Sequence, residues 1–186
     1  MRMQYLSGLA LLVSAACIDA LPVAAQSVAP ADLEGLVLSG AVNYAGTFRR
    51  AGLTYDADIV RRFTVKIGSQ GTISTLVVRE VHYQGTVTKM NRSFSGKIGV
   101  PGQTEDSKVL WILEGNTLTG LNVFEVGGRS TKFTLKRAGS GFSCSVAAPF
   151  MHEMGAGNTK TSAAKGGKAE IVKIRQTGSS CAAKKG

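Results

Sequence analysis

The sequence predicts an all-β domain, an antiparallel β-sandwich or a small β-barrel built as a meander of about 8–10 strands and carrying one disulfide. Three observations predict this class. Polar and apolar side chains alternate along several segments, strand candidates recur at a spacing of roughly 8–12 residues, and glycine-containing turn sequences separate them. From residue 41 onward no segment holds a sustained apolar period of about 3.6 residues, so we expect no long helix there.

The clearest strand candidate is Arg62–Ile67, in which polar and apolar residues alternate without a break. Successive side chains of a strand point to opposite faces, so Phe63, Val65 and Ile67 should face a core. The polar residues between them should face water. The segment Lys132–Lys136 repeats this pattern and predicts a second strand of the same kind.

Enrichment in β-branched and aromatic residues predicts the other strands. They are Val42–Phe48, Thr72–Tyr83, Thr86–Met90, Ser93–Ile98, Val109–Glu114, Thr117–Val126, Phe142–Ala147 and Glu170–Gln176. Turn sequences lie between several of these segments, at Gly68–Gly71, Gly115-Asn116, Gly127-Gly128 and Gly139–Gly141. Glycine suits such turns because it adopts positive φ angles without a Cβ clash.

Residues 1–25 have the order of regions found in a secretory signal peptide. Met1–Met3 is a short, positively charged start, Leu6–Ala16 is an apolar run, and Val23 and Ala25 are the small residues that a signal peptidase prefers. The apolar run is shorter than the roughly 20 residues that a membrane-spanning helix needs. We therefore expect cleavage after Ala25, a periplasmic or secreted protein, and no transmembrane anchor.

Cys17 leaves one alternative to this cleavage site. Ser14–Cys17 loosely resembles a lipobox, in which the cysteine becomes the lipidated first residue of the mature protein. Ser14 stands where leucine is usual, so the site after Ala25 fits better.

Two cysteines, Cys144 and Cys181, remain after residues 1–25 are removed. An even pair in an exported protein predicts a structural disulfide. The alternative, a redox-active pair, is disfavoured because the two residues lack the C-x-x-C spacing. The bridge would close a loop of about 38 residues and stabilise the fold by up to roughly 4 kcal/mol in the chain-entropy description.

The mature chain divides into three parts. Residues 26–40 should form a lead-in or linker, in which Ala31–Leu36 is long enough for one or two helical turns. Residues 41–181 should form the β-sandwich or barrel domain. Residues 182–186, which follow the second cysteine, should form a loose basic tail.

Several motifs carry a resemblance to a known family. They are Phe94–Gly99 with Pro101-Gly102, Trp111, Asn116–Thr119, Ser140–Cys144, Gly166–Lys168 and Ser179–Cys181. On these motifs, the stretch from about Tyr44 to Cys181 resembles a family of uncharacterised, exported, β-rich proteins of alphaproteobacteria. The resemblance implies export, an all-β fold and a paired Cys144–Cys181. It implies no activity, ligand or catalytic residue, because the family has none assigned.

The motifs of common enzyme classes are incomplete in this sequence. Ser162–Lys165 matches the S-x-x-K nucleophile pattern of penicillin-binding proteins and class A β-lactamases, but the S-D-N and K-T-G partner strings are missing. His152-Glu153 lacks the second histidine of H-E-x-x-H, and Gly166–Lys168 lacks the hydroxyl residue that ends a P-loop. We therefore predict no enzyme and no catalytic residues.

Metal ligands are equally sparse. His82 and His152 are far apart in the sequence, and each is expected to be an ordinary, half-exposed side chain. Asp56 and Asp58 are expected in a loop and do not complete the calcium-binding pattern of an EF-hand. We predict no metal and no cofactor.

The net charge of +10 is the remaining functional lead. Residues 48–98 carry a net charge of +6 and residues 150–186 a net charge of +5, so the excess lies in two blocks. Strand alternation directs several of these cations toward solvent. Six of them form a candidate anion-binding surface: Arg62, Lys66, Lys132, Lys136, Lys173 and Arg175. If their strands lie side by side, the six make a basic stripe suited to an anionic polysaccharide or lipid headgroup.

Two function hypotheses follow. The first is an exported, non-enzymatic β-domain that binds an anionic envelope component or a small ligand. The alternative is a structural or envelope-associated interaction protein with no discrete ligand, in which the basic faces only keep the domain soluble. A lipocalin-like carrier, which needs an internal pocket above roughly 300 Å³, ranks below both. Nucleic acid is an unlikely partner, because a chain with 1 Trp and 4 Tyr offers few rings for base stacking.

Overall fold

The computed structural model describes residues 27–99, 111–121, 130–148, 160–162 and 168–186, and within these ranges the chain is almost entirely β-strand. The strands are β1 (Leu36–Arg50), β2 (Leu53–Ile67), β3 (Thr72–Tyr83), β4 (Thr86–Gly99), β5 (Trp111–Glu114), β6 (Thr117–Leu121), β7 (Ser130–Ala138), β8 (Gly141–Ala147), β9 (Lys160–Ser162) and β10 (Lys168–Lys185). Two short 3-10 helices, η1 (Pro30–Leu33) and η2 (Ser69–Gly71), accompany them. Neither has the length or apolar character needed to cross a lipid bilayer, and the described ranges contain no other helix.

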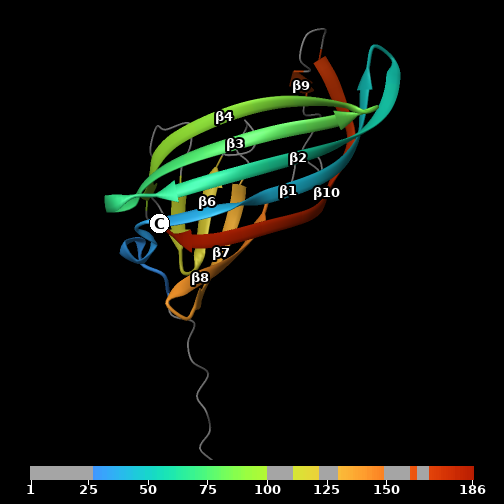
Figure 1. Ribbon diagram of the computed structural model, residues 1–186. Coiled ribbons are helices and arrows are strands. Elements are labelled where there is room, and N and C mark those ends of the chain that lie inside the picture. Colours follow the sequence, from blue (N-terminus) through green and yellow to red (C-terminus); the bar gives the residue numbers. More distant parts are fainter. Residues whose placement is uncertain (1–26, 100–110, 122–129, 149–159, 163–167) are drawn as a thin grey trace, which may run out of the picture.

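All ten strands belong to one sheet, in the order β8-β7-β6-β5-β4-β3-β2-β1-β10-β9. The strands from β1 to β8 follow one another as a meander, and β10 returns to pair with the free side of β1. The pairings are antiparallel except between β4 and β5, which pair in parallel. The sheet curls so that the long strands β1–β4 and β10 arch over the shorter strands β6–β8 (Figure 1). The predicted all-β class is confirmed as a nearly closed, barrel-like sheet.

The predicted alternation on β2 is confirmed. Phe63, Val65 and Ile67 are 3%, 0% and 2% exposed, whereas Arg62 and Lys66 are exposed. The matching segment on β7 behaves in the same way, with its apolar side chains buried and its lysines exposed. One face of the sheet therefore forms the core, called here the inner face, and the other faces solvent.

Two tight hairpin turns join the longest strands. Ala51-Gly52 connects β1 to β2 with φ angles of 48° and 80°, and Gln84-Gly85 connects β3 to β4 with φ angles of 47° and 75°. Two consecutive positive φ angles are what a type I′ turn requires, and this turn matches the twist of the strands it joins. Gly115-Asn116 and Gly139-Ser140 form turns where the sequence predicts them.

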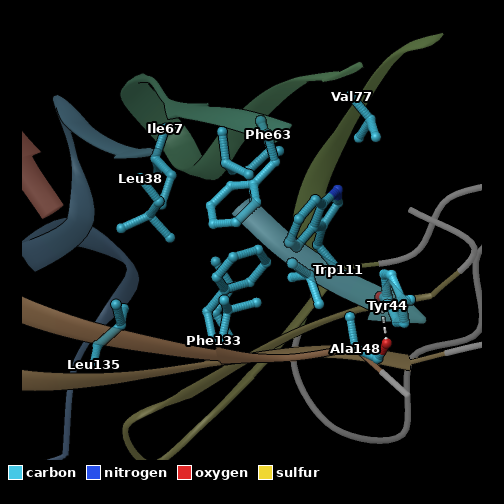
Figure 2. Packing of buried hydrophobic residues seen from close by; sticks show 14 of the residues in the cluster. Leu38, Tyr44, Phe63, Ile67, Val77, Trp111, Phe133, Leu135 and Ala148 are labelled. Carbon is cyan, nitrogen blue, oxygen red and sulfur yellow. Dashed lines mark hydrogen bonds between the residues drawn. The ribbon is translucent and has the colours of Figure 1, made fainter. Parts of the chain in front are cut away.

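The core forms where the long strands cover β5–β8. The rings of Phe63 on β2 and Phe133 on β7 meet edge-on at 5.2 Å between centroids, and Trp111 on β5 stacks against Phe133 at 6.1 Å. Figure 2 shows these three rings together at the centre of the packed cluster. Tyr44 joins the same cluster, and its hydroxyl donates a hydrogen bond of 2.6 Å to the carbonyl oxygen of Ala148. Aromatic contacts thus link β2 to β5 and β7 across the core.

The sheet closes where β8 meets β10. The predicted disulfide joins Cys144 on β8 to Cys181 on β10, with an S–S distance of 2.01 Å and a Cα–Cα distance of 5.5 Å. Nearby, the backbone N–H of Ala148 donates to the side-chain oxygen of Gln176 at 3.3 Å. Among the described residues, no backbone ladder joins β8 to β10, so this seam is formed by side chains and the disulfide.

The boundaries of the domain differ from the prediction at both ends. Residues 36–40 belong to β1 rather than to a lead-in, and residues 182–185 belong to β10 rather than to a loose tail. These two segments pair with each other, with Leu36 opposite Lys185 and Leu38 opposite Ala183. Leu36 and Leu38 are almost completely buried. The small and basic residues of the last segment are ordered because they pair with this buried part of β1.

Two further strand predictions are corrected. Thr86–Met90 and Ser93–Ile98 form a single strand, β4, because polar side chains on both of its faces hide the period of two. Asp56 and Asp58 lie within β2 rather than in a loop, since the turn at Ala51-Gly52 lets both strands of the hairpin extend.

We predict that Gly40→Ala destabilises the fold by about 1–3 kcal/mol, because an added Cβ has no room. It would meet the backbone oxygen of Ser180 and approach the Phe63 ring to 2.9 Å. Chemical denaturation followed by the fluorescence of Trp111, the single and fully buried tryptophan, measures the change. Gly178→Ala is the matched control, since the nearest atom to its Cβ lies at 3.8 Å. Equal stability of the two variants would contradict this account.

We expect the double substitution of Cys144 and Cys181 by alanine to lower the free energy of unfolding by about 2–4 kcal/mol, because the bridge restricts the unfolded chain. The same denaturation curve, recorded with and without a thiol reductant, measures it. The reductant should destabilise the wild type and leave the double variant unchanged. Two reactive thiols in the mature protein would contradict the disulfide.

Candidate functional site

Three arginines from adjacent strands lie on the inner face of the sheet, where apolar side chains are the norm. Arg61 on β2 is directly opposite Arg79 on β3. Arg92 on β4 is opposite Val77, the inner-face residue two positions from Arg79, and so lies diagonal to it. Opposite residues of an antiparallel pair have Cβ atoms about 5 Å apart and diagonal ones about 7–8 Å. We call these three side chains the arginine row.

Arg61 is the buried end of the arginine row. The residue is 1% exposed, and its guanidinium carbon lies 5.0 Å from the centroid of the Tyr44 ring, in a cation–π contact. Burial lowers the pKa of Arg61 to about 10, an effect that Tyr44 opposes and that the positive charges of Arg79 and Arg92 reinforce. Arg61 stays protonated at neutral pH, so a full positive charge is held inside the sheet.

Arg79 and Arg92 carry the row from the interior toward solvent. Arg79 is half-buried, and its Nη2 lies 3.9 Å from the sulfur of Met90, while its buried Nε has no hydrogen-bond partner. Burial, followed by the charge of Arg92, lowers the pKa of Arg79. Among the described residues, no carboxylate lies within 4.0 Å of the guanidinium of Arg79 or of Arg92. The exposed Arg92 is the end that a solute reaches first.

Apolar side chains surround the arginine row on the same face. Met90 and Phe94 flank Arg92 on β4, and both are half-buried. Toward the end of the hairpins, the Tyr55 and Tyr83 rings lie 4.7 Å apart between centroids. Guanidinium groups hold carboxylates and phosphates through paired hydrogen bonds, and the flanking side chains favour apolar groups. This face can therefore hold a small molecule with an anionic group attached to an apolar part.

The six cations of the predicted surface are all exposed. They form three separate pairs: Arg62 and Lys66 on β2, Lys132 and Lys136 on β7, and Lys173 and Arg175 on β10. Four strands separate β7 from β2, and β1 separates β2 from β10. The structure thus brings the six into no single stripe. Whether any pair binds an anion stays a prediction.

Glu80 on β3 engages one of these cations. Its carboxylate is 3.7 Å from the Nε of Arg62, 3.0 Å from the Nζ of Lys89 and 3.6 Å from the Nε2 of His82, although Glu80 itself is only 8% exposed. The hydrogen bond from Lys89 is the largest of several effects that hold the pKa of Glu80 below its ordinary value, and partial burial opposes them. Arg62 therefore already has a counter-charge.

The other residues considered from sequence are found in ordinary surroundings. His82 is half-exposed, as predicted, and Asp56 accepts a hydrogen bond of 2.7 Å from the Thr47 hydroxyl. No group of three or more metal-ligating side chains occurs in the described ranges. Ser162 ends strand β9, not the helix start that its S-x-x-K pattern needs. The predicted signal peptide, with Cys17, and also His152 and Lys165 lie outside the described residues.

The arginine row was missed from sequence, although one signal pointed to it. Extending the alternation of Phe63, Val65 and Ile67 back by two residues places Arg61 on the inner face. No such signal exists for Arg79, because Leu76, Val77 and Val78 precede it as an unbroken apolar run. Arg92 lies in β4, where polar residues interrupt the alternation on the face that carries Met90 and Phe94.

Comparison of the chain with protein-family models, curated protein sequences and solved structures found no match. The resemblance to exported alphaproteobacterial proteins therefore stays a prediction.

We predict that Glu80→Gln lowers stability at neutral pH and flattens its decline in acid. Because the folded pKa of Glu80 is depressed, its contribution is complete above the ordinary glutamate value of 4.5 and is lost as the pH falls through the lower, folded pKa. Unfolding curves between about pH 7 and pH 3 test this. Glu114→Gln, at an exposed carboxylate on β5, is the control and should keep the wild-type slope. An unchanged slope in Glu80→Gln would contradict the role of the ion pairs.

Proposed function

We propose that this protein is an exported, non-enzymatic β-domain that binds a small anionic amphiphile, a molecule with a carboxylate or phosphate group on an apolar part. The single observation that carries the proposal is the arginine row on the inner face. Export rests on the signal-peptide pattern of residues 1–25 and is consistent with the disulfide, a bond that persists in oxidising compartments.

Electrostatics supports an anionic ligand at the arginine row. Like charges directly opposite one another destabilise a sheet, and Arg61 and Arg79 are such a pair. Burial adds a desolvation cost to each guanidinium. An anion placed among Arg61, Arg79 and Arg92 would remove both costs, so the site favours negatively charged ligands over neutral ones of the same shape.

The gradient of exposure along the row supports a ligand that enters from the side of Arg92. Exposure rises from the buried Arg61 through the half-buried Arg79 to the exposed Arg92. The half-buried Met90 and Phe94 lie beside that exposed end, where an alkyl or aryl group of the ligand would pack against them. A purely polar anion would leave this apolar surface unused.

The alternative, an envelope-associated interaction protein with no discrete ligand, is favoured by a different observation. The six exposed cations are divided among three strands, so they offer no continuous basic surface. Dispersed charge of this kind keeps a domain soluble without recognising a partner.

Calorimetric titration with n-decyl phosphate, below its micellar concentration, tests the proposal. We expect saturable binding by the wild type, and we expect Arg92→Gln to weaken it by roughly tenfold or more, because a charge-assisted hydrogen bond contributes about 1.5–3 kcal/mol. The uncharged detergent n-decyl maltoside should bind much more weakly. Arg92 is exposed, so its substitution should leave folding intact.

Lys97→Gln is the matched control, since it removes the same charge from the solvent-facing side of the same strand. It should bind decyl phosphate like the wild type. An equal loss in both variants would show that net charge alone attracts the ligand. A wild type that binds neither the anionic nor the uncharged probe would favour the interaction protein.

A further inference from the structure

A depression of about 500 Å³ lies on the solvent-facing side of the sheet, away from the arginine row. Its floor is β1, which contributes only small residues there: Ala45, Gly46 and Thr47. The strands on either side of β1 form its walls. Because the floor carries no long side chain, the charged groups of the two walls face each other across an open gap.

The two walls carry opposite charges in matching register. On one side β10 contributes Lys173, opposite Thr47, and Arg175, opposite Ala45. On the other side β2 contributes Asp56, also opposite Thr47, and Asp58, also opposite Ala45. The depression is therefore crossed by two parallel rows, each with a cation, a small residue and a carboxylate. Neighbouring strands lie about 4.8 Å apart, so each row spans roughly 10 Å of backbone.

The opposite charges do not neutralise each other directly. No ion pair within 4.0 Å joins Asp56 or Asp58 to Lys173 or Arg175 in the described part of the chain. Asp56 accepts one hydrogen bond, from the Thr47 hydroxyl, through Oδ1. The two aspartates of one wall and the two cations of the other all line the space between the walls.

We infer that this depression binds a small zwitterion, a molecule with a primary ammonium group and a phosphate or carboxylate group a few ångströms apart. The ammonium group lies against Asp56 and Asp58, and the anionic group lies against Lys173 and Arg175. Two hydrogen bonds of about 2.8 Å and the length of such a molecule together fill the gap between the walls. The site is separate from the arginine row, so this inference stands or falls independently of the proposed function.

The walls also determine which kind of cationic group fits. A primary ammonium has three N–H donors, which match the acceptor oxygens of two carboxylates. A quaternary ammonium has none and is recognised by a cage of aromatic rings. The lining contains only one ring, the imidazole of His82. The site therefore selects phosphoethanolamine over phosphocholine, whether the group is free in solution or belongs to a lipid.

Titration of O-phosphoethanolamine and phosphocholine into isotopically labelled protein, followed by amide chemical shifts, tests the inference. We expect phosphoethanolamine to shift the amides of β1, β2 and β10 around Ala45–Thr47 and to bind at least tenfold more tightly than phosphocholine. Asp58→Asn should remove this selectivity, and Arg175→Gln should weaken both ligands. Lys184→Gln, an exposed cation on β10 outside the depression, is the control and should change neither. All three substituted side chains are exposed, and Trp111 fluorescence verifies folding of each variant.

The outcomes show whether the carboxylate wall contributes to binding, and whether the ligand is a lipid headgroup or a free compound. Equal affinity for inorganic phosphate and phosphoethanolamine, unchanged by Asp58→Asn, would overturn the inference, as would the absence of any saturable shift. Flotation with vesicles of phosphatidylethanolamine and of phosphatidylcholine identifies the source. Selective co-flotation with phosphatidylethanolamine indicates the lipid headgroup, and binding of the soluble compound alone indicates a free zwitterion.

Discussion

Closure of the sheet onto itself is the constraint on which the buried core depends. The meander ends at β8, and side-chain packing, the Cys144–Cys181 bridge and the hydrogen bond between Ala148 and Gln176 join this edge to β10. The same closure presses β7 under β2, so that Phe133 meets Phe63. It also explains the glycine at position 40, where β1 lies too close to β10 for a side chain. The aromatic core and the disulfide therefore both stabilise the curled form of the sheet.

The sequence predicts this fold well where one face of a strand is apolar and the other polar. Phe63 and Phe133 were assigned to the core from alternation alone, and both are buried. Alternation gives no clear prediction where the two faces of a strand differ little in polarity. On β4 polar residues interrupt the apolar face, so the strand was divided, and the basic residues near Lys184 resemble a tail until their pairing with β1 is seen. Pairing between distant segments gives these residues their structure, and no local pattern encodes it.

The candidate sites were predicted less completely, for a related reason. The six cations were correctly placed on exposed positions, but their distribution over three strands depends on sheet order, which the sequence does not contain. Arg61 was missed, although the alternation around Phe63 places it on the inner face, whereas the proximity of Arg92 to Arg79 requires the register of β3 against β4. The depression beside Thr47 depends on three strands at once, one of them far along the chain.

The pairing of β1 with β10 has a consequence for how the protein comes to be folded. The backbone N–H of Ala41 meets the side chain of Ser180 across 139 positions of sequence. During folding, β1 can pair with its sequence neighbour β2 early, but its other edge stays open until the last strand, β10, has joined it. Contacts between such distant segments form slowly, and an open strand edge invites pairing with other chains. A chain of this topology therefore needs protection from aggregation until its last strand has paired with β1.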